Sequence, residues 1–154
     1  MKAEHINPFI VAVTSVFKQA LNLDLERGDI SLKSNCQPSL GLSAILSLTG
    51  RASGLVVLSM DPTVAMHAAE VLLGEKVCEV NQDVIDLTGE LGNMVAGKAK
   101  SLLEQYEMNL GLPSVITGKN HVISFPANVH PIAIPFDSPV GPVQIDAGLA
   151  ENAG

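Results

Sequence analysis

The spacing of apolar side chains predicts a helix near the start of the chain, followed by strands. Phe9, Val13 and Phe17 recur at helical spacing, and Asn7-Pro8 before them has the composition of a helix cap and a first-turn proline. We therefore expect a first helix from Asn7 to about Leu23. Shorter apolar runs then predict three strands, at residues 30–33, 42–48 and 55–60.

Two more helices and a second group of strands are expected in the rest of the chain. Asp61-Pro62 predicts the start of a helix that Gly74 ends, and Asn81 predicts the start of a longer helix to about Tyr106. Strand-like runs then return at residues 114–116, 121–125, 132–136 and 143–147. The segment 137–141 between the last two has the composition of a hairpin turn.

This order of elements predicts an α+β fold. A helix leading into a strand meander occurs twice, which indicates a pseudo-duplicated domain with an antiparallel sheet and a long third helix. The length of 154 residues favours one domain over residues 1–154, with 150–154 as a loose tail. Prolines crowd the last strands and predict edges and bends there rather than central strands: Pro126, Pro131, Pro135, Pro139 and Pro142.

Composition and charge exclude several classes of protein. Hydrophobic residues make up 47% of the chain and charged residues 16%, which argues against intrinsic disorder. The net charge of −7, with one Tyr and no Trp, argues against a nucleic-acid partner, which would favour a basic surface with aromatic rings. No run reaches the roughly 18 apolar residues of a membrane span, so we expect no membrane association and a cytoplasmic location.

Several well-known constellations of chemical residues are incomplete in this chain. Residues 92–98 imitate a phosphate-binding loop, but Ala99 replaces the magnesium-binding Ser or Thr and the segment is predicted to be helical. Cys36 and Cys78 are expected to be free thiols. The four histidines lack metal-ligand spacing: His5, His67, His121 and His130. We therefore expect no metal ion or cofactor held by the chain itself.

The third helix carries a polar stripe opposite its predicted buried face. At 100° per residue, Asp86, Glu90 and Asn93 share one narrow face and are expected to be exposed. The predicted buried face consists of Val84, Leu87, Leu91, Met94, Val95 and Leu102. Glycines at 89 and 97 flank the stripe, and each costs helix stability, so we expect them to leave room for a large partner. Gly92 is expected to let a neighbouring element pack closely.

The segment Asp86–Asn93 resembles the (Asp/Ser)-x3-Glu-x2-Asn signature of the CheC/CheX/FliY phosphatases of bacterial chemotaxis. The resemblance extends from about residue 5 to 149 and is greatest to the CheX branch, which carries one motif copy. Pro113 is an approximate match to the motif's proline, which lies somewhat farther downstream in the family. A second copy is not expected in the first helix, where Ser15, Gln19 and Asn22 stand at motif spacing, because Gln19 replaces the carboxylate.

The resemblance implies a function and roles for the motif residues. The substrate would be the phosphoaspartate of a CheY-type response regulator, which would itself hold the Mg²⁺ ion. Glu90 would form an ion pair with a lysine in the regulator's active site, and Asn93 would hold the attacking water. Asp86 would orient neighbouring groups or simply border the motif. The resemblance to CheX and the open sheet edge expected at the proline-rich strands also predict a homodimer.

Two other functions remain open at the level of sequence. A CheC- or FliM-like domain could bind a regulator or another signalling domain without turnover, as a binding or scaffold protein. The chain could also be a ligand-sensing α+β domain, for which the sequence indicates no pocket residues. The intact Glu90 and Asn93 favour an enzyme.

Overall fold

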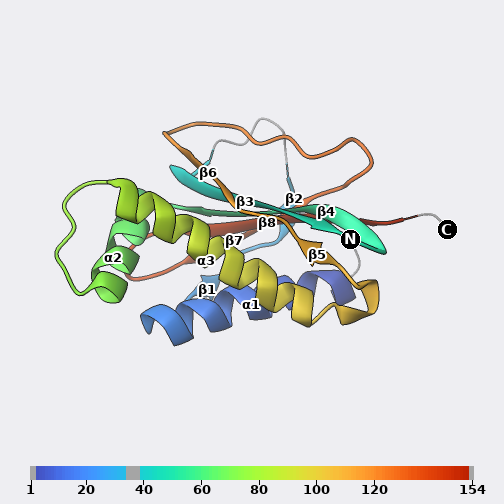
Figure 1. Cartoon of the computed structure of the whole chain (residues 1–154), viewed down its shortest axis with the longest axis horizontal. Helices are drawn as coiled ribbons and strands as arrows, with labels where there is room; N and C mark the ends of the chain where they lie inside the picture. Colours follow the sequence, from blue (N-terminus) through green and yellow to red (C-terminus); the bar gives the residue numbers. More distant parts are fainter. Residues whose placement is uncertain (1–2, 34–38, 153–154) are drawn as a thin grey trace.

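The computed structural model describes residues 3–33 and 39–152, in which three α-helices cover one face of a β-sheet (Figure 1). The helices are α1 (Ala3–Leu21), α2 (Pro62–Leu73) and α3 (Gln82–Ser101), and a short 3₁₀ turn, η1 (Glu104–Tyr106), follows α3. The strands are β1 (Glu26–Arg27), β2 (Ser31–Leu32), β3 (Leu42–Thr49), β4 (Ala52–Met60), β5 (Asn109–Leu110), β6 (Ser114–Thr117), β7 (Ile132–Asp137) and β8 (Val143–Glu151).

The strands form one antiparallel sheet. Its order is β1-β7-β8-β4-β3-β5, with β2 also paired to β7 and β6 also paired to β3. The long central strands are β4 and β8, which pair along their whole length. The predicted α+β fold with an antiparallel sheet is therefore confirmed, whereas the pseudo-duplication stays a prediction.

The two faces of the sheet are covered differently. The helices bury the main apolar core against one face, with Phe9 and Phe17 of α1 and Leu58 of β4 fully buried. The coil between β6 and β7, orange in Figure 1, crosses the opposite face. Its side chains Phe125 and Val129 lie against β8, close to the position where Gly148 would carry a Cβ. The motif helix therefore belongs to a layer with one side on the sheet and the other in solvent.

The capping residues predicted for α2 and α3 are confirmed. The Asp61 carboxylate accepts a hydrogen bond from Thr63 N at 3.0 Å, and the Asn81 side chain accepts one from Val84 N at 3.1 Å. Gly74 ends α2 in the left-handed conformation, which glycine adopts without strain. The hairpin predicted at residues 137–141 joins β7 to β8.

The predicted start of the first helix is wrong. The helix already includes Ala3, and Pro8 lies inside it rather than in its first turn. The turn before the proline is held by His5, which is buried and bonds through Nε2 to Tyr106 Oη at 2.5 Å. Tyr106 in turn donates to Glu151 at 2.8 Å, and this hydrogen bond is the largest cause of the raised pKa of Tyr106. A contact far along the chain thus overrides the local proline signal.

Other boundaries also differ from the prediction. The third helix ends at Ser101, and Tyr106 belongs to η1. Residues 121–125 are coil instead of a strand, because the His121 ring bonds to Gly118 O and to Ser43 Oγ, each at 2.8 Å, and turns the chain over the sheet.

The proline-rich end of the chain is also more ordered than expected. The outer edge of β7 is already paired with β1 and β2, and Pro135 accepts a hydrogen bond from Gly28 N. The expected loose tail is contradicted at its start, since β8 continues to Glu151 and Asn152 N donates to Arg51 O. Cys78 is free and exposed, whereas Cys36 lies outside the described residues.

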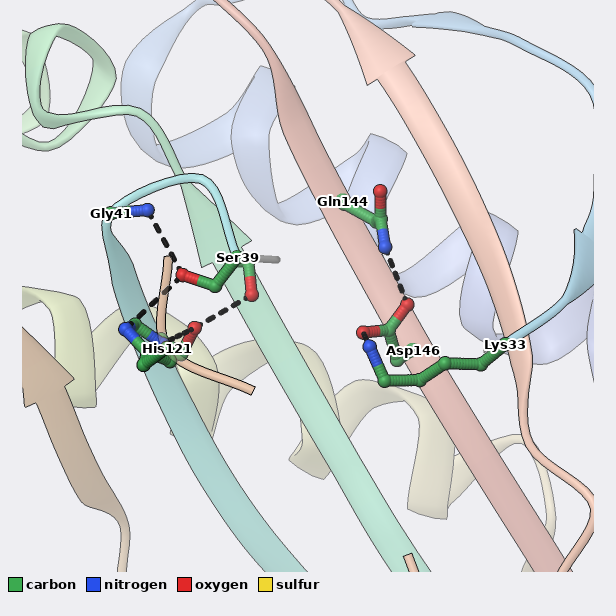
Figure 2. A network of polar contacts seen from close by, with 8 residues as sticks. Lys33, Ser39, Gly41, His121, Gln144 and Asp146 are labelled. Carbon is green, nitrogen blue, oxygen red and sulfur yellow. Dashed lines mark hydrogen bonds and ion pairs between the residues drawn. The ribbon is translucent and has the colours of Figure 1, made fainter. Parts of the chain in front are cut away.

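The sheet face opposite the helices carries a buried polar network (Figure 2). Lys33 Nζ lies 2.7 Å from Asp146 Oδ2, and these side chains are 6% and 3% exposed. Gln144 donates to the other carboxylate oxygen of Asp146 at 2.8 Å. Ser43 Oγ on β3 bonds to Ser59 Oγ on β4 at 2.8 Å, as well as to His121. These bonds fasten the segment after β2 and the coil after β6 to the central strands.

Replacing Lys33 should destabilise the fold strongly. Lys33→Met leaves the buried Asp146 carboxylate without its cation, which should lower the free energy of unfolding by about 3–5 kcal/mol at neutral pH. Urea denaturation followed by circular dichroism measures the change. The double variant Lys33→Met/Asp146→Leu removes both charges and should recover most of the loss. If the free energy of unfolding of Lys33→Met lies within about 1 kcal/mol of the wild-type value, the pair has no stabilising role.

Candidate active site

The motif side chains lie on the solvent side of α3. Asp86 and Glu90 are exposed, as predicted, whereas Asn93 is half-buried. Glu90 and Asn93 are separated by three positions, so their side chains are neighbours on the helix surface. The cap on Asn81 and the packing of α3 against α1, α2 and β3 make this helix a rigid base for the pair.

The buried face of α3 is rotated from the predicted one. Val84, Leu91 and Val95 are buried, but Met94 is 40% exposed and Leu102 is 42% exposed. Small residues complete the buried face instead: Thr88, Gly89, Gly92, Ala96 and Ala99. Thr88 satisfies its hydroxyl by donating to Val84 O at 2.9 Å. Two of them are the residues that meet the sheet, Gly92 against Ala44 and Leu46 and Gly89 against Val115, because the absence of a side chain lets α3 approach it.

The three glycines of α3 have three different environments. A Cβ at position 92 would lie 2.6 Å from Ala44 Cβ and 3.0 Å from Leu46 Cδ1, so Gly92 allows the predicted close packing on β3. The partner-approach role predicted for Gly89 is wrong, because Gly89 is buried and its Cβ would meet Val115 Cγ2 at 3.2 Å. At Gly97, in contrast, no atom lies within 4 Å of a Cβ, so this position is open.

Pro113 is brought to the motif helix by tertiary structure. Its Cγ lies 3.7 Å from the Cβ position of Gly89, which is one helical turn before Asn93. This places the approximate motif proline beside the polar stripe. Its neighbour Leu112 is 92% exposed, and the sequence analysis did not single it out. The available signal was its position between Gly111 and Pro113, two residue types that mark turns and breaks between elements.

Negative charge is concentrated on the first half of the exposed face. Asp83, Asp86 and Glu90 are all exposed, and in the described part of the chain no ion pair involves them. Asp86 accepts a hydrogen bond from Gln82 Nε2 at 2.7 Å, one turn earlier on the same helix. The arrangement can therefore bind a cation supplied from outside, while the Asn93 amide can both donate to and accept from a water molecule.

The structure does not assemble the weak second motif on one helix. Ser15 donates its hydroxyl back to Ala12 O at 3.2 Å, and Asn22 lies beyond the end of α1 with a φ of 51°. Residues 3–33 and 39–152 contain no group of three or more His, Cys, Asp or Glu side chains placed to hold a metal ion. Within the same ranges, no helix is both long and apolar enough to cross a membrane.

Comparisons with known proteins agree on one family. The family model described as "Chemotaxis phosphatase CheX" matches residues 42–137. The chain is 24% identical over 123 residues to the CheY-P phosphatase CheX of Thermotoga maritima, covering 78% of this chain and 79% of that protein. A CheC-like superfamily protein from Shewanella sp. PV-4 has a similar structure, with a TM-score of 0.90, 32% identity and coverage of 97% and 99% of the two chains. The CheX-CheY-BeF₃-Mg²⁺ complex from Borrelia burgdorferi matches with a TM-score of 0.81, 26% identity and coverage of 96% and 98%.

Alanine substitutions at two glycines of α3 should change stability in opposite directions. Gly97→Ala should raise the free energy of unfolding by about 1 kcal/mol, because the position is open and alanine favours the helix. Gly92→Ala should lower it by about 1–3 kcal/mol, because the new methyl group would overlap Ala44. Chemical denaturation of both variants measures the difference. A destabilising Gly97→Ala would show that this position does not face solvent.

Proposed function

The chain belongs to the CheX family of chemotaxis phosphatases, and on this premise we propose that it hydrolyses the aspartyl phosphate of a CheY-type response regulator. The observation that carries the proposal is the presentation of Glu90 and Asn93 on one outward face of a rigid helix. A carboxylate that can bind a cation and an amide that can orient water are suited to hydrolysing a phosphate that a partner holds.

Glu90 supplies the docking contact. Its nearest charged neighbour at helical spacing is Asp86, also acidic, and two carboxylates four positions apart repel by a few tenths of a kcal/mol. A lysine ammonium from the regulator's active site relieves this repulsion when it approaches. The ion pair fixes the orientation of the two proteins, and the exposed position of Glu90 allows it to form without rearrangement of the helix.

Asn93 positions the attacking water. Its half-buried side chain has fewer accessible rotamers than a fully exposed one, so the amide is held in a limited set of directions. Phosphoryl transfer to water passes through a loose, roughly in-line transition state, in which catalysis consists mainly of positioning and charge placement. The amide oxygen and nitrogen hold the water in line with the phosphorus, opposite the aspartate oxygen that leaves.

The regulator supplies the Mg²⁺ ion in this mechanism. The ion neutralises charge on the phosphoryl oxygens, as metal ions do in phosphoryl transfer generally. The Borrelia complex contains CheY and Mg²⁺ together with CheX, which supports a mechanism in which the metal ion comes with the regulator. This chain then contributes a carboxylate and an amide to a site whose metal and phosphate belong to the partner.

Asp86 and Gly97 have supporting roles. Asp86 is bonded to Gln82, so it holds the first turns of α3 together and adds negative charge near Glu90. Gly97 lies one turn beyond Asn93 with open space above it, so the regulator can approach the helix there. Gly89 has no part in this approach because it packs on Val115 and Pro113.

The phosphatase is further proposed to act in the cytoplasm as a homodimer, on the basis of the CheX-like sequence features. The pairing of β7 with β1 and β2 removes the argument from an open edge at the proline-rich strands. Static light scattering at micromolar concentration should give about twice the monomer mass of 16.1 kDa. A mass equal to that of the monomer would refute the dimer and leave the phosphatase proposal standing.

Glu90 and Asn93 should have separable effects on the reaction. Asn93→Ala should bind the phosphorylated regulator nearly as well as the wild type but reduce turnover by about 10²-fold or more, because the water is no longer positioned. Glu90→Ala should mainly weaken binding, and Glu90→Lys should weaken it further by placing two cations together. Single-turnover phosphate release across a titration of this protein separates the two effects.

Controls for this experiment come from the same chain. Asn128→Ala changes an exposed asparagine of the coil between β6 and β7 and should leave both binding and turnover unchanged. Asp83→Asn removes an exposed charge from the first turn of α3 and should alter binding less than Glu90→Ala. Near-wild-type turnover by folded Asn93→Ala would exclude the water-positioning role and favour a binding module without catalysis.

A further inference from the structure

The edge strand beside the motif helix contains one extra residue. On β3, Leu48 pairs with Leu110, whereas Ile45 pairs with Ser114. Three steps along β3 therefore correspond to four steps along the β5–β6 edge. Gly111 N still donates to Ser47 O at 2.9 Å, so the extra residue lies between Gly111 and Ser114. Leu112 and Pro113 together oppose Leu46, which is the arrangement of a β-bulge.

The bulge interrupts the regular alternation of side chains between the two faces of the sheet along this edge. Leu46, which lies opposite the bulge, faces α3, because its Cδ1 lies 3.0 Å from the Cβ position of Gly92. Pro113 follows the same direction and packs beside Gly89. Without the bulge, strand alternation would place Leu112 and Pro113 on opposite faces. With the bulge, Pro113 packs beside α3, and the preceding Leu112 is 92% exposed.

Apolar side chains consequently border the polar stripe on both sides. Met94, which is 40% exposed, follows Glu90 by one turn on the side away from the sheet edge. The Leu112-Pro113 bulge borders the other side, next to Gly89 and one turn from Asn93. A single exposed leucine is ordinary on a protein surface. The backbone of Leu112, however, is held between Gly111, which bonds to Ser47 of β3, and Pro113, which packs beside Gly89 of the motif helix.

We propose that Leu112 is an apolar anchor for the phosphorylated CheY-type regulator, inserted into an apolar surface beside the regulator's phosphorylation site. The inference rests on the proposed function, because the anchor is continuous with the Glu90–Asn93 stripe. Without Leu112, the stripe would bind the regulator only through the Asn93 amide and an exposed ion pair between Glu90 and the regulator's lysine. Exposed ion pairs contribute little to binding. Buried apolar anchors commonly dominate protein–protein affinity, with polar contacts setting orientation. Leu112 therefore contributes binding affinity, whereas Glu90 sets the orientation of the two proteins and Asn93 positions the attacking water.

The test compares substitutions at two exposed leucines on opposite edges of the sheet. Leu112→Ser should raise the KM for the phosphorylated regulator about tenfold and leave kcat within twofold of wild type. Leu112→Met keeps an apolar side chain and should restore KM to within twofold. Leu32→Ser on β2, where the leucine is 76% exposed, is the matched control and should change neither constant. Since both leucines are exposed, melting temperatures should stay close to that of the wild type.

Binding is measured separately, by titrating each variant with a CheY-type regulator carrying BeF₃ and Mg²⁺. A parallel tenfold weakening for Leu112→Ser, with no change for Leu32→Ser, supports the anchor even when turnover is slow. Unchanged KM and binding for Leu112→Ser overturn the anchor but leave the proposed function intact. Light scattering that shows Leu112→Ser to be a monomer and the wild type a dimer also overturns it, because the leucine then contacts a second copy. A wild-type chain that neither binds nor dephosphorylates the regulator overturns both proposals.

Discussion

The close approach of α3 to β3 is the constraint on which the site depends. At Gly92 the helix backbone comes so near to Ala44 and Leu46 that a methyl group would not fit without displacement. This contact fixes the rotation of α3 about its axis, and therefore decides which residues point to solvent. Glu90 and the half-buried Asn93 are presented together only because the opposite side of the helix is held at that distance.

The same strand organises the surroundings of the stripe. One face of β3 receives α3, its outer edge pairs with β5 and β6, and its other face contributes Ser43 to the polar network with Ser59 and His121. The bulge at Leu112-Pro113 is defined by its register on β3, so the same strand positions both α3 and the bulge. Contact with β3 therefore fixes the position of the polar stripe on α3 relative to the Leu112-Pro113 bulge.

Such an architecture suits an enzyme that completes a site in another protein. The first half of α3 exposes acidic side chains, and the described residues provide no cation to neutralise them by an ion pair. A partner that brings a cation can form an ion pair with this face. A rigid helix carrying a carboxylate and an amide loses little conformational freedom on docking, so more of the binding energy remains for orienting water against the phosphate.

Elements whose signals are local could be predicted from the amino-acid sequence alone. The caps at Asp61 and Asn81, the stop at Gly74 and the motif spacing of Asp86, Glu90 and Asn93 all act within a few residues. The structure places them as expected, except that Asn93 is half-buried. The family and the α+β class follow from the same information. Four features could not be predicted from local patterns: the turn before Pro8, the coil at residues 121–125, the burial of Gly89 and the bulge at Leu112. Each depends on contacts between residues far apart in the chain, whose register and distance no local pattern encodes.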